Sequence, residues 1–171
     1  MYPKYIKLIL AVLTLSCSVF QFYENNIGNG IALIFLMIIF VFLYFKNEII
    51  LLAFLRLRKQ DFNGTEKWLN KIKNPESALT KKQVGYYNYL KGIISSQTNL
   101  TLAEKYFKKA ISLGLSMNHD LAMAKLSLAG ILIQKRRKRE ATTLLNEAKK
   151  IDTQKMLSDQ IKMMQQQMKK I

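Results

Sequence analysis

A triplet of small, large and small residues recurs at a constant spacing of 38 residues. The three triplets, of which the first is the least regular, are Thr65, Leu69 and Ile72; Ala103, Phe107 and Ala110; and Ala141, Leu145 and Ala148. Residues three and four positions apart lie on one face of a helix. Small residues let a neighbouring helix approach closely, and the large residue fills the space between the two contacts. A fixed period of this length predicts stacked helical hairpins.

Each repeat is expected to contain two helices, and the repeats are expected at about 47–75, 82–114 and 120–152. In the second repeat, Thr101 and Glu104 have the spacing of a capping box at the start of the second helix. Gly114 is a typical residue at a helix end. In the first repeat, 48–59 continues almost directly from the apolar segment before it, and 61–73 ends before Pro75.

The units resemble tetratricopeptide repeats, and the resemblance covers most of residues 48–152. The residues that carry it are Tyr87, Leu90 and Ile94 with the second triplet, and Leu128, Ala129 and Leu132 with the third. The sequence departs from the family in three ways. Lys91 occupies the usual small site, with Gly92 beside it; Arg56 stands where an aromatic residue is expected; and the period is 38 rather than 34 residues. The alternative is a general array of helical hairpins.

Two apolar segments precede the repeats, at 5–23 and about 28–46. A span of roughly 20 residues is needed to cross about 30 Å of hydrocarbon. The linker between the segments is short and rich in Asn and Gly, so the segments must form an antiparallel hairpin. Residues 1–46 are therefore predicted to be a membrane anchor. The chain is expected to be all-α, with this anchor, two to three repeats and a C-terminal capping helix.

The basic residues predict the orientation of the anchor. Lysines and arginines flank its outer ends, whereas residues 24–30 contain none. The positive-inside rule then places both termini and the repeats in the cytoplasm, which indicates a multi-pass protein of a bacterial inner membrane. An alternative interpretation of residues 4–17 is a lipoprotein signal with acylation of Cys17. Thr14 and the apolar residues after Cys17 argue against that interpretation.

Residues 153–171 are predicted to form a last helix. Its apolar residues lie on a single stripe: Leu157, Ile161, Met164, Met168 and Ile171. In repeat arrays the terminal helix covers the exposed face of the last unit. The alternative is a seam for self-association, and the oligomeric state does not follow from the sequence.

No catalytic or metal-binding pattern is evident. The sequence lacks a Gly-rich phosphate loop, a His-Glu metal motif and a nucleophile beside a base. Cys17 is the single cysteine, and His119, the single histidine, is expected in a polar turn between helices. These residues cannot supply the four ligands of a structural zinc site. The sequence therefore predicts a protein that is not an enzyme and needs no cofactor.

The tetratricopeptide resemblance implies a groove lined by the first helix of each repeat. The side chains that would face a ligand are Asn88, Gly92, Ser95 and Ser96, and Met123, Leu126, Gly130, Ile133 and Gln134. The clamp for C-terminal carboxylates that is familiar in this family is mostly missing. The groove suggests a helix or an extended peptide as ligand, or it is filled by the chain's own C-terminal helix.

Charge is the second candidate for recognition. Of the 27 Lys and Arg residues, 25 follow residue 45, and the net charge of the chain is +16. Five of these cations are consecutive, on the turn of the third repeat: Lys135, Arg136, Arg137, Lys138 and Arg139. They are candidates for contact with anionic lipid or with RNA phosphates. Nucleic acid is the less favoured partner because no aromatic platform lies beside the run. The alternative to a binding role is that these cations are simply exposed to solvent on the turn.

These features favour a membrane-anchored scaffold or adaptor that binds proteins or assembles a complex at the cytoplasmic face of a bacterial inner membrane. One alternative is a basic membrane tether for RNA, ribosomes or anionic lipid. Another is an accessory subunit whose hairpin packs into a larger membrane complex. The identity of the protein partner does not follow from the sequence.

Overall fold

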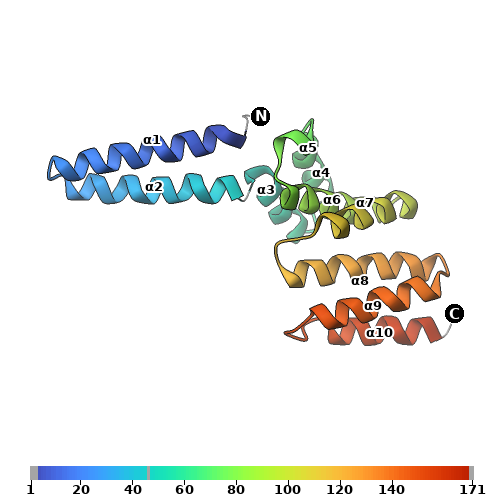
Figure 1. Ribbon diagram of the computed structural model, residues 1–171. Helices are drawn as coiled ribbons and strands as arrows, with labels where there is room; N and C mark the ends of the chain where they lie inside the picture. The colour runs from blue at the N-terminus through green and yellow to red at the C-terminus, as the bar shows by residue number, and fades with distance from the viewer. Residues whose placement is uncertain (1–3, 46, 170–171) are drawn as a thin grey trace.

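The computed structural model describes residues 4–45 and 47–169, which form ten helices and no strand (Figure 1). The predicted all-α fold is therefore confirmed for the described part of the chain. Lys46, expected at the end of the second apolar segment, and Ile171, expected on the C-terminal stripe, lie outside the described residues.

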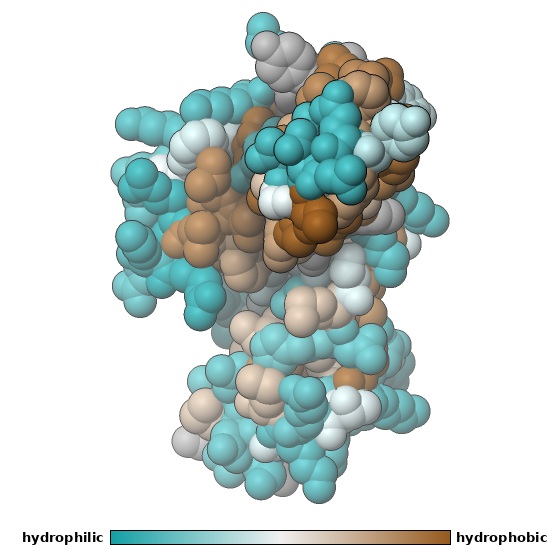
Figure 2. All heavy atoms as spheres, turned by 90° about the vertical axis from the view of Figure 1, so that its left-hand side faces the viewer, coloured by the Kyte–Doolittle hydropathy of each residue, from teal (hydrophilic) through white to brown (hydrophobic). Residues whose placement is uncertain are grey.

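The two apolar segments form an antiparallel hairpin of α1 (Lys4–Tyr23) and α2 (Ile27–Phe45). Both helices are long and apolar enough to cross a membrane. Ser18 lies buried between them, and its hydroxyl donates a hydrogen bond to the Gly30 carbonyl at 2.8 Å. Figure 1 shows the hairpin extending away from the remaining helices, and Figure 2 shows its largely hydrophobic surface around a polar tip.

Three further hairpins form the array that follows, and its elements are α3 (Glu48–Arg58) with α4 (Phe62–Asn70), α6 (Lys81–Ser95) with α7 (Leu100–Leu113), and α8 (Asn118–Gln134) with α9 (Lys138–Ile151). The short α5 (Pro75–Ala78), which the sequence analysis did not predict, connects the first pair to the second. All nine residues of the 38-residue triplets are buried. The small positions therefore lie at close helix contacts, as their spacing predicts.

The ends of α7 differ in part from the prediction. Asn99 caps its N-terminus, because the Asn99 side-chain oxygen accepts a hydrogen bond from the Leu102 N–H at 3.0 Å. Thr101 thus lies inside the helix, and the predicted capping box with Glu104 is wrong. A capping box does occur at the start of α6, between Thr80 and Gln83. Gly114 ends α7 as predicted, with a positive φ of 75°.

The connection between α8 and α9 is shorter than the basic run. Lys135, Arg136 and Arg137 form the turn, and Arg136 adopts a φ of 58°. Lys138 and Arg139 belong to the first turn of α9, so the prediction that all five cations lie on the turn is wrong. His119, predicted between helices, lies in the first turn of α8.

The last helix, α10 (Ser158–Lys169), packs against the third hairpin. Leu157, Ile161 and Met168 are buried in the same core as α8 and α9, and Met164 is partly buried there. The apolar stripe therefore faces the array rather than solvent. This packing agrees with the predicted capping role.

Candidate binding surfaces

A mostly apolar hollow of about 250 Å³ lies where α3, α6 and the start of α8 meet. Its lining residues come from the first helix of each hairpin and from the α7–α8 connection: Asn47, Ile50, Leu51, Phe54, Lys82, Gln83, Tyr86, Ser116, Met117 and Asp120. In Figure 1 the α7–α8 connection and the start of α8 lie toward the hairpin. The hollow is therefore on the side of the array from which the hairpin extends.

Hydrogen bonds hold the polar side chains of the hollow in place. The Tyr86 hydroxyl donates to the Asp120 carboxylate, which links α6 to α8. Burial, and then this hydrogen bond, raise the pKa of Tyr86, so the phenol stays protonated. The side-chain amide of Gln83 donates to the Tyr44 carbonyl at 3.0 Å and links α6 to the last turn of α2. The Lys82 ammonium donates to the Leu115 carbonyl at 3.2 Å. The walls of the hollow are thus fixed to three other parts of the chain.

The groove residues predicted on α6 do not line this hollow. Asn88 donates to the carbonyl of Val84 in its own helix at 2.7 Å, and it lines a separate surface hollow beside α5 and α7. A Cβ atom at Gly92 would lie 3.0 Å from the Phe107 ring, so Gly92 faces α7. Ser95 is buried, and the Ser96 hydroxyl donates to the Ile93 carbonyl at 2.7 Å. The residues predicted on this helix therefore lie on other faces than the one that lines the hollow.

A shift of one residue in register explains this difference. The family spacing puts the small site at Lys91, but the Lys91 ammonium lies 2.8 Å from the side-chain oxygen of Asn70 on α4. Gly92 takes the small site against Phe107 instead. Each residue of an α-helix advances by about 100°, so one step moves every assigned side chain by more than a quarter turn. Gln83 and Tyr86 consequently face the hollow.

On α8 the predicted groove is partly covered by the chain itself. Leu126 and Ile133 are buried in the core. A Cβ atom at Gly130 would contact the terminal methyl of Met164 on α10 at 3.4 Å. Met123 is half-buried, and Gln134 is exposed. The alternative in which the C-terminal helix fills part of the groove is therefore supported at Gly130.

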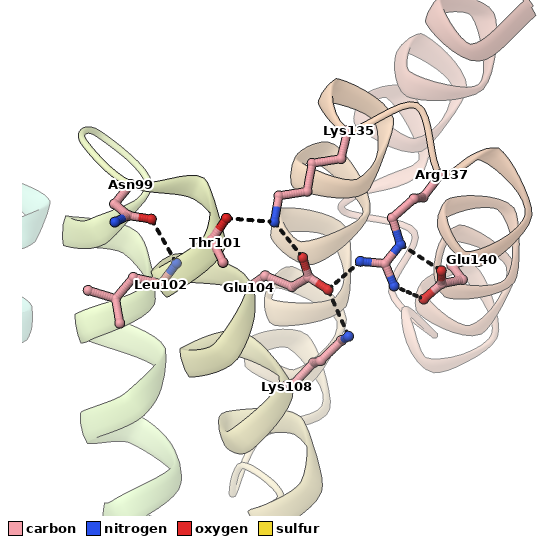
Figure 3. Close-up of polar contacts among 8 residues, drawn as sticks. All are labelled: Asn99, Thr101, Leu102, Glu104, Lys108, Lys135, Arg137 and Glu140. Carbon is pink, nitrogen blue, oxygen red and sulfur yellow. Dashed lines mark hydrogen bonds and ion pairs between the residues drawn. The ribbon is translucent and has the colours of Figure 1, made fainter.

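Two cations of the basic run bind a buried carboxylate (Figure 3). The Glu104 carboxylate on α7 forms ion pairs with Lys135 at 2.7 Å, with Arg137 at 2.6 Å and with Lys108 of its own helix at 2.7 Å. Hydrogen bonds from Lys108, then from Lys135 and Arg137, lower the pKa of Glu104 to about 2 although burial raises it. Arg137 also forms two hydrogen bonds with Glu140, at 2.6 and 2.7 Å. Two of the five predicted contact residues, Lys135 and Arg137, are thus paired with carboxylates of the chain itself and are only partly exposed.

The other three cations, Arg136, Lys138 and Arg139, are exposed. Figure 1 shows the α8–α9 turn at the opposite end of the array from the hairpin. If the hairpin spans a membrane, this turn points away from that membrane. The run therefore offers three cations rather than five to an anionic partner, and its position does not suit lipid of the same bilayer.

The hollow is lined by residues that the sequence analysis did not assign to a common site. Asn47, Tyr86 and Asp120 belong to three different hairpins. The signal in the sequence is weak: Tyr86 and Asp120 each place a polar group beside an apolar stripe. Within the described residues, no three His, Cys, Asp or Glu side chains form a group able to hold a metal ion. No protein-family model, curated protein or solved structure matches the chain.

Proposed function

We propose that the protein is a membrane-anchored adaptor whose helical array binds a protein partner in the hollow at the base of the hairpin. The observation that carries this proposal is the hollow itself, an apolar surface with fixed walls to which α3, α6 and α8 contribute. Ligand sites are typically concave and mostly apolar, with a few polar groups that fix orientation. Tyr86, Gln83 and Asp120 are such polar groups here.

The hairpin is the anchor. At 20 and 19 residues, α1 and α2 are each roughly 30 Å long, which matches the hydrocarbon core of a bilayer. Most of their large apolar side chains are exposed, as lipid contact requires. The tip between them has no Lys or Arg, whereas Arg56, Arg58 and Lys59 follow the other end. By the positive-inside rule, the array and both termini lie in the cytoplasm of a bacterium and the hairpin spans its inner membrane.

The position of the hollow narrows the class of partner. Asn47, which lines the hollow, comes two residues after the end of α2, so the hollow lies close to the point where that helix leaves the membrane. A partner segment that emerges from the same membrane would reach the hollow without a long linker. The partner is therefore a membrane protein that inserts an apolar juxtamembrane segment, helical or extended, between α3 and α8. The resemblance to tetratricopeptide repeats agrees with this mode of binding.

Two methionines with similar exposure provide a matched test. Met117 lines the hollow and is 57% exposed, whereas Met156 is 62% exposed and does not line it. Arginine at position 117 would place a long charged side chain where an apolar ligand offers it no hydrogen-bond partner, which is costly. The Asp120 carboxylate of the hollow already accepts the hydrogen bond from Tyr86. After gentle solubilisation of membranes that contain the tagged full chain, a partner should co-purify with the wild type and with Met156→Arg. Its recovery should fall at least about tenfold with Met117→Arg, the effect of roughly 1.4 kcal/mol.

Two results would count against the proposal. Equal recovery with all three chains would mean that the partner binds elsewhere. No protein above the level of an untagged control would mean that the array does not act as an adaptor in these membranes. Circular dichroism of the purified variants checks that Met117→Arg has not altered the fold.

A further inference from the structure

The helix α3 carries exposed apolar side chains on a face that the other described helices leave largely uncovered. Ile50 and Ala53 are buried against the array, but Leu51, Leu52 and Leu55 are 42%, 38% and 47% exposed. These three leucines share one side of the helix, because residues one and four positions apart lie within about a third of a turn. An exposed group of large apolar residues is unusual for a surface in water and marks an interaction site.

The leucine face lies close to the membrane end of the hairpin. Only residues 46 and 47 separate α2 from α3, and two residues span at most about 7 Å. Asn47 caps α3 by accepting a hydrogen bond from the Ile49 N–H at 3.0 Å, so the helix begins directly after the hairpin. The Lys7 ammonium of α1 pairs with the Glu48 carboxylate and holds the first turn of α3 against the hairpin. Figure 2, viewed from the hairpin side, shows a second hydrophobic area beside the hairpin.

The charges on α3 complement this apolar face. Arg56, Arg58 and Lys59 at its C-terminal end are exposed. Arg58 and Lys59 follow Leu55 by three and four positions and therefore extend the leucine side of the helix. Leucines beside cations are the composition of a helix that lies in the plane of a membrane interface. Each Lys or Arg close to an anionic bilayer contributes about 1 kcal/mol of attraction.

We propose that α3 is an interfacial helix, with Leu52 and Leu55 in the boundary between headgroups and acyl chains and with Arg58 and Lys59 among anionic headgroups. Leu51, which also lines the hollow, lies where this boundary meets the hollow. This inference rests on the proposed anchoring of the hairpin. The occupant of the leucine face is lipid of the same bilayer, because the face continues the apolar surface of the hairpin and is tethered beside it. The contact fixes the array against the membrane surface and turns the neighbouring hollow toward it.

Fluorescence of site-specific labels in the full chain tests this contact. Cys17 is replaced by Ser, and one cysteine at a time is introduced and labelled with an environment-sensitive fluorophore. The positions are Leu52→Cys and Leu55→Cys on α3, Phe35→Cys on α2 as the membrane control and Leu102→Cys on α7 as the aqueous control. Leu102 is 41% exposed, close to the value for Leu55, so the two positions differ in place rather than in exposure. Each protein is reconstituted in vesicles of phosphatidylcholine and phosphatidylglycerol that carry a nitroxide at a shallow or a deep acyl position.

The expected result is a depth order. Labels at positions 52 and 55 should emit at shorter wavelength than the label at 102 and lose intensity mainly to the shallow nitroxide. The label at 35 should lose intensity mainly to the deep nitroxide. If only the label at 35 is quenched, the anchor stands and the inference about α3 is overturned.

Labels at 52 and 55 that are protected from both lipid nitroxide and aqueous iodide would indicate contact with protein, which also overturns it. An unquenched label at position 35 would refute the anchoring itself, and the inference about α3 would fall with it.

Discussion

At the scale of single residues, Glu104 joins two repeats. Its carboxylate lies on α7 and is bonded to Lys135 and Arg137 from the α8–α9 turn (Figure 3). An equivalent contact occurs 38 residues earlier, where Glu66 on α4 lies 3.5 Å from the Lys91 ammonium on α6. A carboxylate on the second helix of one repeat thus pairs with a cation of the next repeat at both junctions.

Replacement of Glu104 should reveal this role through its dependence on pH. Because the folded state lowers the pKa of Glu104 from 4.5 to about 2, the stabilisation is present above the ordinary pKa and is lost as the pH falls toward 2. Glu104→Gln should lower the free energy of unfolding by about 1–3 kcal/mol at neutral pH. The difference from wild type should shrink between about pH 5 and pH 2.

The measurement is the midpoint of thermal unfolding in detergent, with Glu147→Gln as control. Among the described residues, Glu147 pairs only with Lys125, and it is more exposed than Glu104, so its removal should cost at most about 1 kcal/mol. An equal loss from Glu104→Gln at pH 3 and pH 7 would contradict the role of the ionised carboxylate.

At the scale of helices, glycines set the distance between α6 and α7. Gly85 and Gly92 are seven residues apart and therefore lie on the same face of α6. A Cβ atom at Gly85 would lie 2.6 Å from the backbone oxygen of Gly114, and one at Gly92 would lie 3.0 Å from the Phe107 ring. The two helices therefore approach more closely at these positions than a side chain would allow.

Two glycine-to-alanine substitutions should therefore have opposite signs. Alanine normally stabilises a helix interior by about 1 kcal/mol relative to glycine. Gly130→Ala should show this gain, because its Cβ would meet the Met164 methyl at an ordinary 3.4 Å. Gly85→Ala should instead lower the midpoint of unfolding, since the backbone must shift at a net cost of about 1–3 kcal/mol. Stabilisation by both substitutions would show that α6 and α7 separate without cost.

The sequence predicted which segments form helices better than it predicted which side of each helix faces a neighbour. The triplet around Phe107 follows from spacing alone, because small residues can be recognised wherever two helices cross. The hollow around Tyr86 could not be derived in the same way. Its position depends on whether Lys91 or Gly92 takes the small site. Which of the two residues faces α7 depends on the contact of Lys91 with Asn70, a residue of α4 in another repeat. The true cap at Asn99 was missed because Thr101 offered an equally good local pattern.

At the scale of the whole molecule, polar contacts of Lys7 and Gln83 join the hairpin to the array. The Lys7 ammonium, which also donates to the Leu43 carbonyl within the hairpin at 3.3 Å, pairs with the Glu48 carboxylate of α3. The Gln83 amide of α6 donates to the Tyr44 carbonyl of α2 at 3.0 Å. These contacts lie at the array end of the hairpin, whereas the tip at Asn25 and Asn26 is at the far end (Figure 1). If the hairpin spans a bilayer, the tip and the array lie on opposite sides of it.

Cysteine labelling tests which side each part occupies. In a Cys17→Ser background, Asn26→Cys at the tip and Gln154→Cys after α9 are both exposed positions. An impermeant thiol reagent should label the chain with Asn26→Cys in intact spheroplasts, because the tip has no Lys or Arg to hold it in the cytoplasm. It should label the chain with Gln154→Cys only after lysis. Labelling of Gln154→Cys alone in intact cells would reverse the orientation, and labelling of both would refute a spanning hairpin.

The link from Gln83 to Tyr44 has a practical consequence for work with the isolated array. A fragment that begins after α2 lacks both the carbonyl that accepts this bond and the Lys7 ammonium that holds Glu48. In such a fragment, Leu51, Leu52 and Leu55 would also face water beside the open hollow. Exposed apolar surface of this kind promotes aggregation. Ligand screening therefore needs the uncut chain in a nanodisc, where the first repeat keeps its neighbours.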